Sequence, residues 1–251
     1  MGKTKGKPDI FTRFATFVPI TAPPFPTSGM QPTPYIDIHT HRRSNDPYVI
    51  DAYAVGSDGS LPAGPYSAGI HPWEVQRITP DNTSRYRQDL LDALTPRCIA
   101  VGEIGLDYAV TGDSVLRTAQ RHWFEQQMEL AADRSLPVII HCVRTYNDLI
   151  PILRHYPHVT PVIHGFTGSP ELAERLLQAG GYLSFGHRTA ASPKTRQALA
   201  AVPVDRVFFE TDESPLPIAA TYATAAAITG KTVAEWKETV YDNYRRLFKT
   251  P

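Results

Sequence analysis

Two histidines at the end of an apolar run are the residues of this chain best suited to bind a metal ion. His39 and His41 follow the run from Tyr35 to Ile38 as His-Thr-His. Side chains at alternate positions of a strand point the same way, so both imidazoles can face one cation at the strand's carboxyl end. Histidines also cap strands by bonding nearby backbone, so the pair alone leaves both roles open.

Four more side chains suited to metal binding occupy the same kind of position. Each stands at or just past the end of an apolar, β-rich run: Glu103, His141, His164 and Asp212. In a parallel α/β barrel the ends of different strands face one mouth, so residues distant in sequence meet there. Six such residues in equivalent positions predict a metal site at that mouth.

The order of apolar runs predicts an α/β fold, a TIM-type (β/α)8 barrel. Strands are expected at about residues 35–39, 48–55, 66–70, 97–103, 137–141, 160–164, 181–185 and 206–210. Helical patterns separate the later runs, at 80–94, 114–134, 145–155, 169–179, 192–200, 218–228 and 232–248. Residues 46–64 contain no helix-length pattern. We therefore expect a distorted barrel, pinched or partly antiparallel there, with a helix missing after the first strand.

The beginning of the chain differs from the rest. The first 29 residues contain many prolines and four basic side chains, without periodicity. They predict an N-terminal extension at residues 1–34, outside a barrel domain at residues 35–250. An arm packed on the barrel is the alternative, and Met30 is a second candidate for the initiator.

Composition limits the classes of function. No stretch approaches the roughly 18 to 20 apolar residues of a membrane span. Cys98 and Cys142 lie in or beside buried-looking runs, and their spacing does not suggest a disulfide framework. We expect a cytoplasmic protein without membrane association, and the sequence implies no protein partner. The chain's 25 basic residues match its 25 acidic ones, which argues against a broad surface for duplex DNA.

A series of short motifs runs through the chain in a defined order. They are His39-Thr-His41, Gly69-Ile-His71-Pro72, Gly102-Glu103-Ile-Gly-Leu-Asp107-Tyr108, Val138-Ile-Ile-His141-Cys, His164-Gly-Phe-Thr-Gly-Ser169 and Glu210-Thr-Asp212. Their order resembles the TatD family of metal-dependent deoxyribonucleases, within the amidohydrolase-like metal hydrolases. The resemblance runs from about residue 35 to residue 249.

The resemblance implies two divalent metal ions, which for nitrogen and oxygen ligands would be zinc, magnesium or manganese. Glu103 would bridge the ions, and the other ligands would form a first set of His39, His41 and Asp212 and a second set of His141 and His164. Such an ion pair can hold the attacking and leaving oxygens of a phosphodiester and activate a water. Glu103 and Asp212 would be the catalytic residues, with Asp212 orienting the water or taking its proton.

Two further residues are predicted to bind substrate. His71 follows the third strand and could contact a phosphate, although a turn cap before Pro72 is the alternative. Arg144 lies three residues after His141, whereas the family commonly has an arginine after one intervening residue. The additional Val143 leaves phosphate binding open for Arg144.

Three functions are compatible with these residues. The first is a two-metal phosphodiesterase or deoxyribonuclease that cleaves DNA, from single strands or frayed ends, by a metal-activated water. The second is hydrolysis of a small amide, lactone or ester, because a divalent ion polarises a carbonyl as readily as a phosphoryl oxygen. The third is a binding module that keeps a metal for stability, although a closed structural zinc site needs only four ligands.

Overall fold

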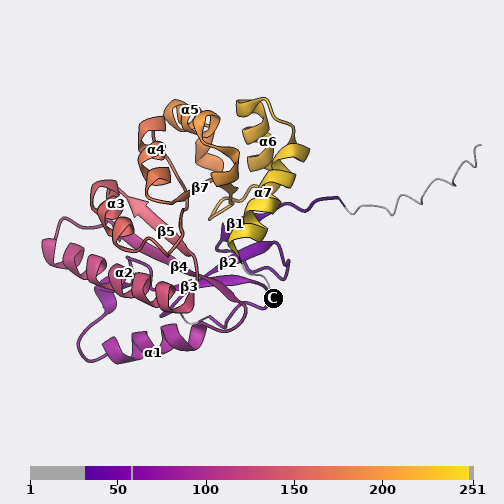
Figure 1. Ribbon diagram of the computed structural model, residues 1–251. Helices are drawn as coiled ribbons and strands as arrows, with labels where there is room; N and C mark the ends of the chain where they lie inside the picture. Colours follow the sequence, from indigo (N-terminus) through magenta and orange to yellow (C-terminus); the bar gives the residue numbers. More distant parts are fainter. Residues whose placement is uncertain (1–31, 58, 249–251) are drawn as a thin grey trace, which may run out of the picture. The chain divides into compact units, whose positions relative to one another are not determined.

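Eight strands pair in chain order in one parallel sheet (Figure 1). The computed structural model describes residues 32–57 and 59–248. The strands are β1 (Asp37–Thr40), β2 (Val49–Ala54), β3 (Tyr66–Gly69), β4 (Cys98–Asp107), β5 (Val138–Val143), β6 (Pro161–Ile163), β7 (Tyr182–Phe185) and β8 (Val207–Phe209). The predicted barrel is confirmed. The expectation of a partly antiparallel region is wrong, since β1, β2 and β3 pair in parallel like their neighbours.

Helices follow the strands from β3 onward. They are α1 (Thr83–Ala93), α2 (Ser114–Arg134), α3 (Tyr146–His155), α4 (Pro170–Gln178), α5 (Pro193–Ala201), α6 (Ile218–Thr229) and α7 (Val233–Leu247). Within the described residues no helix lies between β1 and β3, as predicted. Helix α1 begins three residues later than its predicted start, because the Asn82 side chain accepts a 2.7 Å hydrogen bond from the Thr79 amide and closes a turn there.

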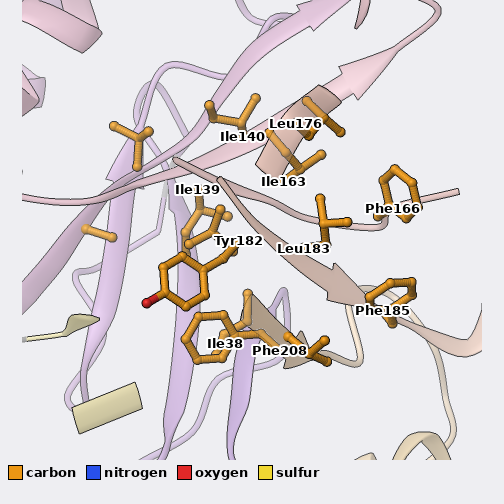
Figure 2. Close-up of a cluster of buried hydrophobic side chains, with 14 of the residues drawn as sticks. Ile38, Ile139, Ile140, Ile163, Phe166, Leu176, Tyr182, Leu183, Phe185 and Phe208 are labelled. Carbon is orange, nitrogen blue, oxygen red and sulfur yellow. The ribbon is translucent and has the colours of Figure 1, made fainter. Parts of the chain in front are cut away.

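Successive side chains of each strand face opposite sides of the sheet. Ile140, Ile163 and Leu183 are register partners on β5, β6 and β7. Figure 2 shows them on the side of Leu176 from α4, whereas Ile139 points the other way. The strands are therefore buried on both faces, which explains why their sequences read as continuous apolar runs.

The barrel closes where β1 meets the segment that follows β8. Thr40 and Asp212 form a parallel bridge, and the Asp212 amide donates a 2.9 Å hydrogen bond to the His39 carbonyl. The Thr211 amide and hydroxyl donate to the Asp37 carboxylate over 3.0 Å and 2.7 Å. Two predicted metal ligands, His39 and Asp212, and their direct neighbours Thr40 and Thr211 thus form the seam of the barrel.

Two further predictions concern the N-terminal extension and the location of the protein. Apart from residues 32–34, the extension predicted at residues 1–34 lies outside the described residues, and so does Met30. Among the helices that the structure describes, none combines the length and apolar character needed to cross a membrane. The cytoplasmic location stays a prediction.

Removal of the Thr211 hydroxyl tests the seam. Thr211→Val keeps the side-chain shape but removes the hydroxyl that donates to Asp37 Oδ2 over 2.7 Å and whose oxygen lies 3.0 Å from the Thr40 hydroxyl. Because a buried polar group left without its partner is costly, we expect the free energy of unfolding to fall by about 1 to 3 kcal/mol in urea titrations. The control is Thr118→Val, whose exposed hydroxyl bonds only within α2. Equal stability of both variants would contradict the seam's role.

Candidate metal centre

The six predicted ligands converge at the carboxyl ends of their strands. His39, Glu103 and His141 lie in β1, β4 and β5, respectively. His41 directly follows β1, His164 directly follows β6, and Asp212 stands three residues after the end of β8. Together they belong to one cluster whose side-chain nitrogen and oxygen atoms approach within hydrogen-bonding or ion-pair distance. The structure thus brings the six residues together, and their role as metal ligands stays a prediction.

One side of the cluster is formed by the first predicted ligand set. Glu103 Oε2 lies 3.3 Å from His39 Nε2 and 3.5 Å from His41 Nε2. Asp212 Oδ1 lies 3.4 Å from His41 Nε2 and 3.9 Å from His39 Nε2. The His39 side chain is fully buried, whereas His41 is 40 % exposed and Asp212 is 23 % exposed. His39 therefore forms the floor, and His41 and Asp212 face the opening.

The other carboxylate oxygen of Glu103 faces a separate set of imidazoles. Oε1 lies 2.6 Å from His141 Nδ1 and 2.7 Å from His164 Nε2. His71 Nε2 also lies 3.2 Å from this oxygen. His71, predicted as a substrate-binding residue, is thus close enough to share a cation with Glu103 and His141. The two oxygens of one carboxylate point to two different groups of nitrogen ligands.

The chemistry of these side chains fits divalent cations. Imidazole nitrogens and carboxylate oxygens are ligands for zinc, manganese or magnesium. Both ring nitrogens of His39 are buried and have no hydrogen-bond partner in the protein, and its Nε2 faces the carboxylates of Glu103 and Asp212. Buried polar atoms normally have partners, so unpaired imidazole nitrogens in this cluster favour a cation as the missing partner. All sets of three or more candidate ligands within the described part of the chain include members of this cluster.

The carboxylates of the cluster are ionised. Burial opposes the ionisation of Glu103, but His164 and His39 outweigh it and hold the pKa of Glu103 well below its usual range. Burial likewise opposes the ionisation of Asp212. The hydrogen bond with His41 and the charge of His39 outweigh this effect and lower the pKa of Asp212. In turn, Asp212 and Glu103 raise the pKa of His41 to about 10. This environment stabilises positive charge, and a metal ion would displace the protons from the imidazoles.

The backbone around two of these residues has an unusual conformation. Gly105 in β4 has φ +137°, and a Cβ atom there would overlap the His141 carbonyl oxygen. Glycine is therefore required where β4 and β5 bring Glu103 and His141 together. Asp212 itself has φ +53°, which is uncommon for residues other than glycine, asparagine and aspartate. Its backbone hydrogen bonds to β1 hold it in this conformation.

A cavity of about 340 Å³ opens above the cluster. Trp73 and Asp107 line it near β3 and β4, and His187 and Arg188 line it after β7. Arg144, the other predicted substrate-binding residue, is exposed in the β5–α3 connection and is not among the lining residues, so its predicted role stays a prediction. Cys142 also lines the cavity, but burial raises the pKa of its thiol to about 12. A thiolate nucleophile is therefore disfavoured.

Comparison with known proteins identifies the family. The sequence profile described as TatD related DNase matches residues 62–249, which is most of the chain. The chain belongs to the TatD family. The resemblance expected from the short motifs is confirmed.

Several relatives extend this comparison. A protein of Haemophilus influenzae named "uncharacterized metal-dependent hydrolase" is 34 % identical over 158 residues, which are 61 % of this chain and 60 % of that protein. The "3'-5' ssDNA/RNA exonuclease TatD" of Citrobacter rodentium is 27 % identical over 191 residues, covering 68 % of this chain and 72 % of that protein. The crystal structure of YjjV, a TatD homologue from Escherichia coli, superposes with a TM-score of 0.70 at 27 % identity, covering 81 % of this chain and 86 % of YjjV.

The chain spans about 60 % of the length of the first curated relatives that it matches. The metal-dependent hydrolase names of these relatives agree with the ligand cluster. The comparisons thus establish the family and the fold of this chain.

Two carboxylates behind the TatD ligands were not assigned a role from the sequence. Asp107 Oδ2 lies 3.1 Å from His141 Nε2, on the opposite side of that ring from Glu103. Glu210 Oε1 accepts a 2.6 Å hydrogen bond from the Gly165 amide and lies 3.5 Å from His164 Nδ1. Carboxylates in such positions fix the orientation of a ligating imidazole.

Replacement of the central carboxylate tests the metal centre. Glu103→Gln keeps the side-chain size but removes the charge between the two imidazole groups, so we expect the affinity for divalent cations to fall by more than about 100-fold, since even outer-shell changes cost 10- to 100-fold. Isothermal titration calorimetry with Mn²⁺ or Zn²⁺ measures this loss. Glu213→Gln, an exposed acid lining the same cavity, should retain the wild-type affinity. Undiminished binding by Glu103→Gln would contradict the assignment.

Proposed function

We propose that this TatD protein is a two-metal phosphodiesterase that removes nucleotides from the ends of single-stranded DNA or RNA. The observation that supports it best is the division of ligands around Glu103, whose Oε2 faces His39 and His41 and whose Oε1 faces His141 and His164. One carboxylate between two nitrogen sets suits a pair of cations better than a single ion. Two bound divalent cations would polarise the phosphoryl group and supply an activated water near neutral pH.

The names of relatives support a nucleic-acid substrate. The Citrobacter rodentium relative is named as a single-stranded DNA and RNA exonuclease, and a human relative is named as a 3'-5' RNA nuclease. The cavity agrees with such a substrate, because Arg188 and His187 stand at its wall where phosphate groups of a strand could contact them. An opening confined to the mouth of one barrel suits a strand end better than a duplex surface.

Asp212 is the residue we assign to proton transfer. Its side chain is partly exposed at the opening, next to His41, and its pKa is lowered, so the carboxylate is ionised and can accept a proton from an attacking water. The bridge to Thr40 and the hydrogen bond to the His39 carbonyl hold Asp212 at a fixed place beside the cluster. Asp107 and Glu210 position His141 and His164 from behind.

An Asp212→Asn variant tests this proposal. Asparagine tolerates the positive φ of this position but cannot take the proton, so we expect kcat to fall by about 100-fold or more. The assay follows nucleotide release from labelled single-stranded DNA and RNA by the metal-loaded protein. Asp205→Asn, an exposed acid that does not line the cavity, is prepared identically and should retain the wild-type rate.

Two results would count against the proposal. Equal cleavage by Asp212→Asn and the wild-type protein would assign the activity to a contaminant. A panel of amides, lactones and carboxylic esters is assayed in parallel with the nucleic acids. If one of these is hydrolysed with a much higher kcat/KM than DNA or RNA, the substrate class is wrong and the small-molecule alternative replaces it.

A further inference from the structure

Trp73 is an exposed aromatic side chain at the rim of the metal centre. The described residues include five exposed large apolar side chains, and Trp73 is the one among them that lines the cavity above the cluster. It is 48 % exposed, whereas Trp123 is 6 % exposed and Trp236 is fully buried. A large aromatic surface left open beside polar ligands indicates a contact with substrate rather than core packing.

The indole is held in place by residues of the metal centre. Trp73 Nε1 donates a 2.8 Å hydrogen bond to Asp107 Oδ2, the same oxygen that lies 3.1 Å from His141 Nε2. The Trp73 amide donates to His71 Nδ1 over 3.1 Å, and the two rings meet edge to face with centroids 4.9 Å apart.

A second hydrogen-bond chain supports this arrangement from beneath. The Asp107 amide donates to Gln120 Oε1 over 3.1 Å, and Gln120 Nε2 donates to the Pro72 carbonyl over 3.2 Å. Gln120 is buried in α2, so the strand end that contains Asp107 and the turn that contains Trp73 are joined to the same helix. The indole is thereby fixed relative to His71 and His141, both of which reach Glu103.

We propose that Trp73 is a stacking platform for the nucleobase next to the scissile phosphate. The cavity combines a metal-binding floor for a phosphate, a fixed aromatic surface at one wall and exposed basic side chains at another, Arg188 and His187. This combination matches the parts of a nucleotide. Stacking on an aromatic ring tolerates every base, because every base has a π-face. The inference rests on the proposed nuclease function and adds its base-binding subsite.

Kinetics with paired substrates test the platform. The metal-loaded 251-residue chain is assayed on a single-stranded oligonucleotide and on the same oligonucleotide with an abasic terminal residue. Trp73→Ala should raise KM for the normal end by about tenfold, change kcat by less than about threefold, and leave KM for the abasic end nearly unchanged. Trp73→Phe keeps an aromatic face and should restore most of the affinity. Val115→Ala, which removes an exposed apolar side chain outside the cavity, should behave as wild type.

A binding measurement makes the two proposals separable. The other two tryptophans are buried, so quenching of fluorescence by a ligand in the cavity reports Trp73. Titration with dAMP should quench the fluorescence, deoxyribose 5-phosphate should quench it far less, and Trp73→Phe should lose the base-dependent part. If no nucleic acid is cleaved but base-dependent quenching persists, the nuclease proposal fails, and Trp73 is a base-binding surface of a site with another function. If DNA is cleaved and Trp73→Ala affects normal and abasic ends equally, the platform is overturned and the nuclease proposal stands.

Discussion

The burial of the Glu103 carboxylate among imidazoles is the constraint on which the site depends. Removing an ionised carboxylate from water costs several kcal/mol unless charged or hydrogen-bonding partners replace the solvent. The protein supplies histidines from four different strand ends around this one group. Because the buried ring nitrogens of His39 lack hydrogen-bond partners within the protein, the cluster is suited to binding a cation.

Two of the predicted metal ligands, His39 and Asp212, also take part in closing the barrel. Strand β1 contributes His39, and the segment after β8 contributes Asp212, whose backbone joins that strand through a bridge and a hydrogen bond. The ligands are therefore positioned by the seam between the first and last strands rather than by flexible loops. The positive φ of Asp212 is maintained by these contacts, which is how an uncommon backbone conformation persists at a functional position.

The sequence predicted the barrel and the meeting of its ligands because strand ends in this fold face a common mouth, a rule that needs no side-chain detail. It did not predict the approach of His71 to Glu103 or the contact of Asp107 with both His141 and Trp73. These contacts join residues on different strands, so they depend on register and side-chain direction, which apolar patterns do not specify. The later start of α1 has a local cause, since Asn82 bonds backbone in a turn rather than admitting a longer helix.

Diffraction from crystals grown with Mn²⁺, measured near the manganese absorption edge, tests the central claim most directly. The account predicts two anomalous peaks about 3.5 to 4 Å apart, one at each oxygen of Glu103, the first bound by His39 and His41 and the second by His141 and His164. A single peak at full occupancy under saturating Mn²⁺, or peaks that do not contact Glu103, would contradict it.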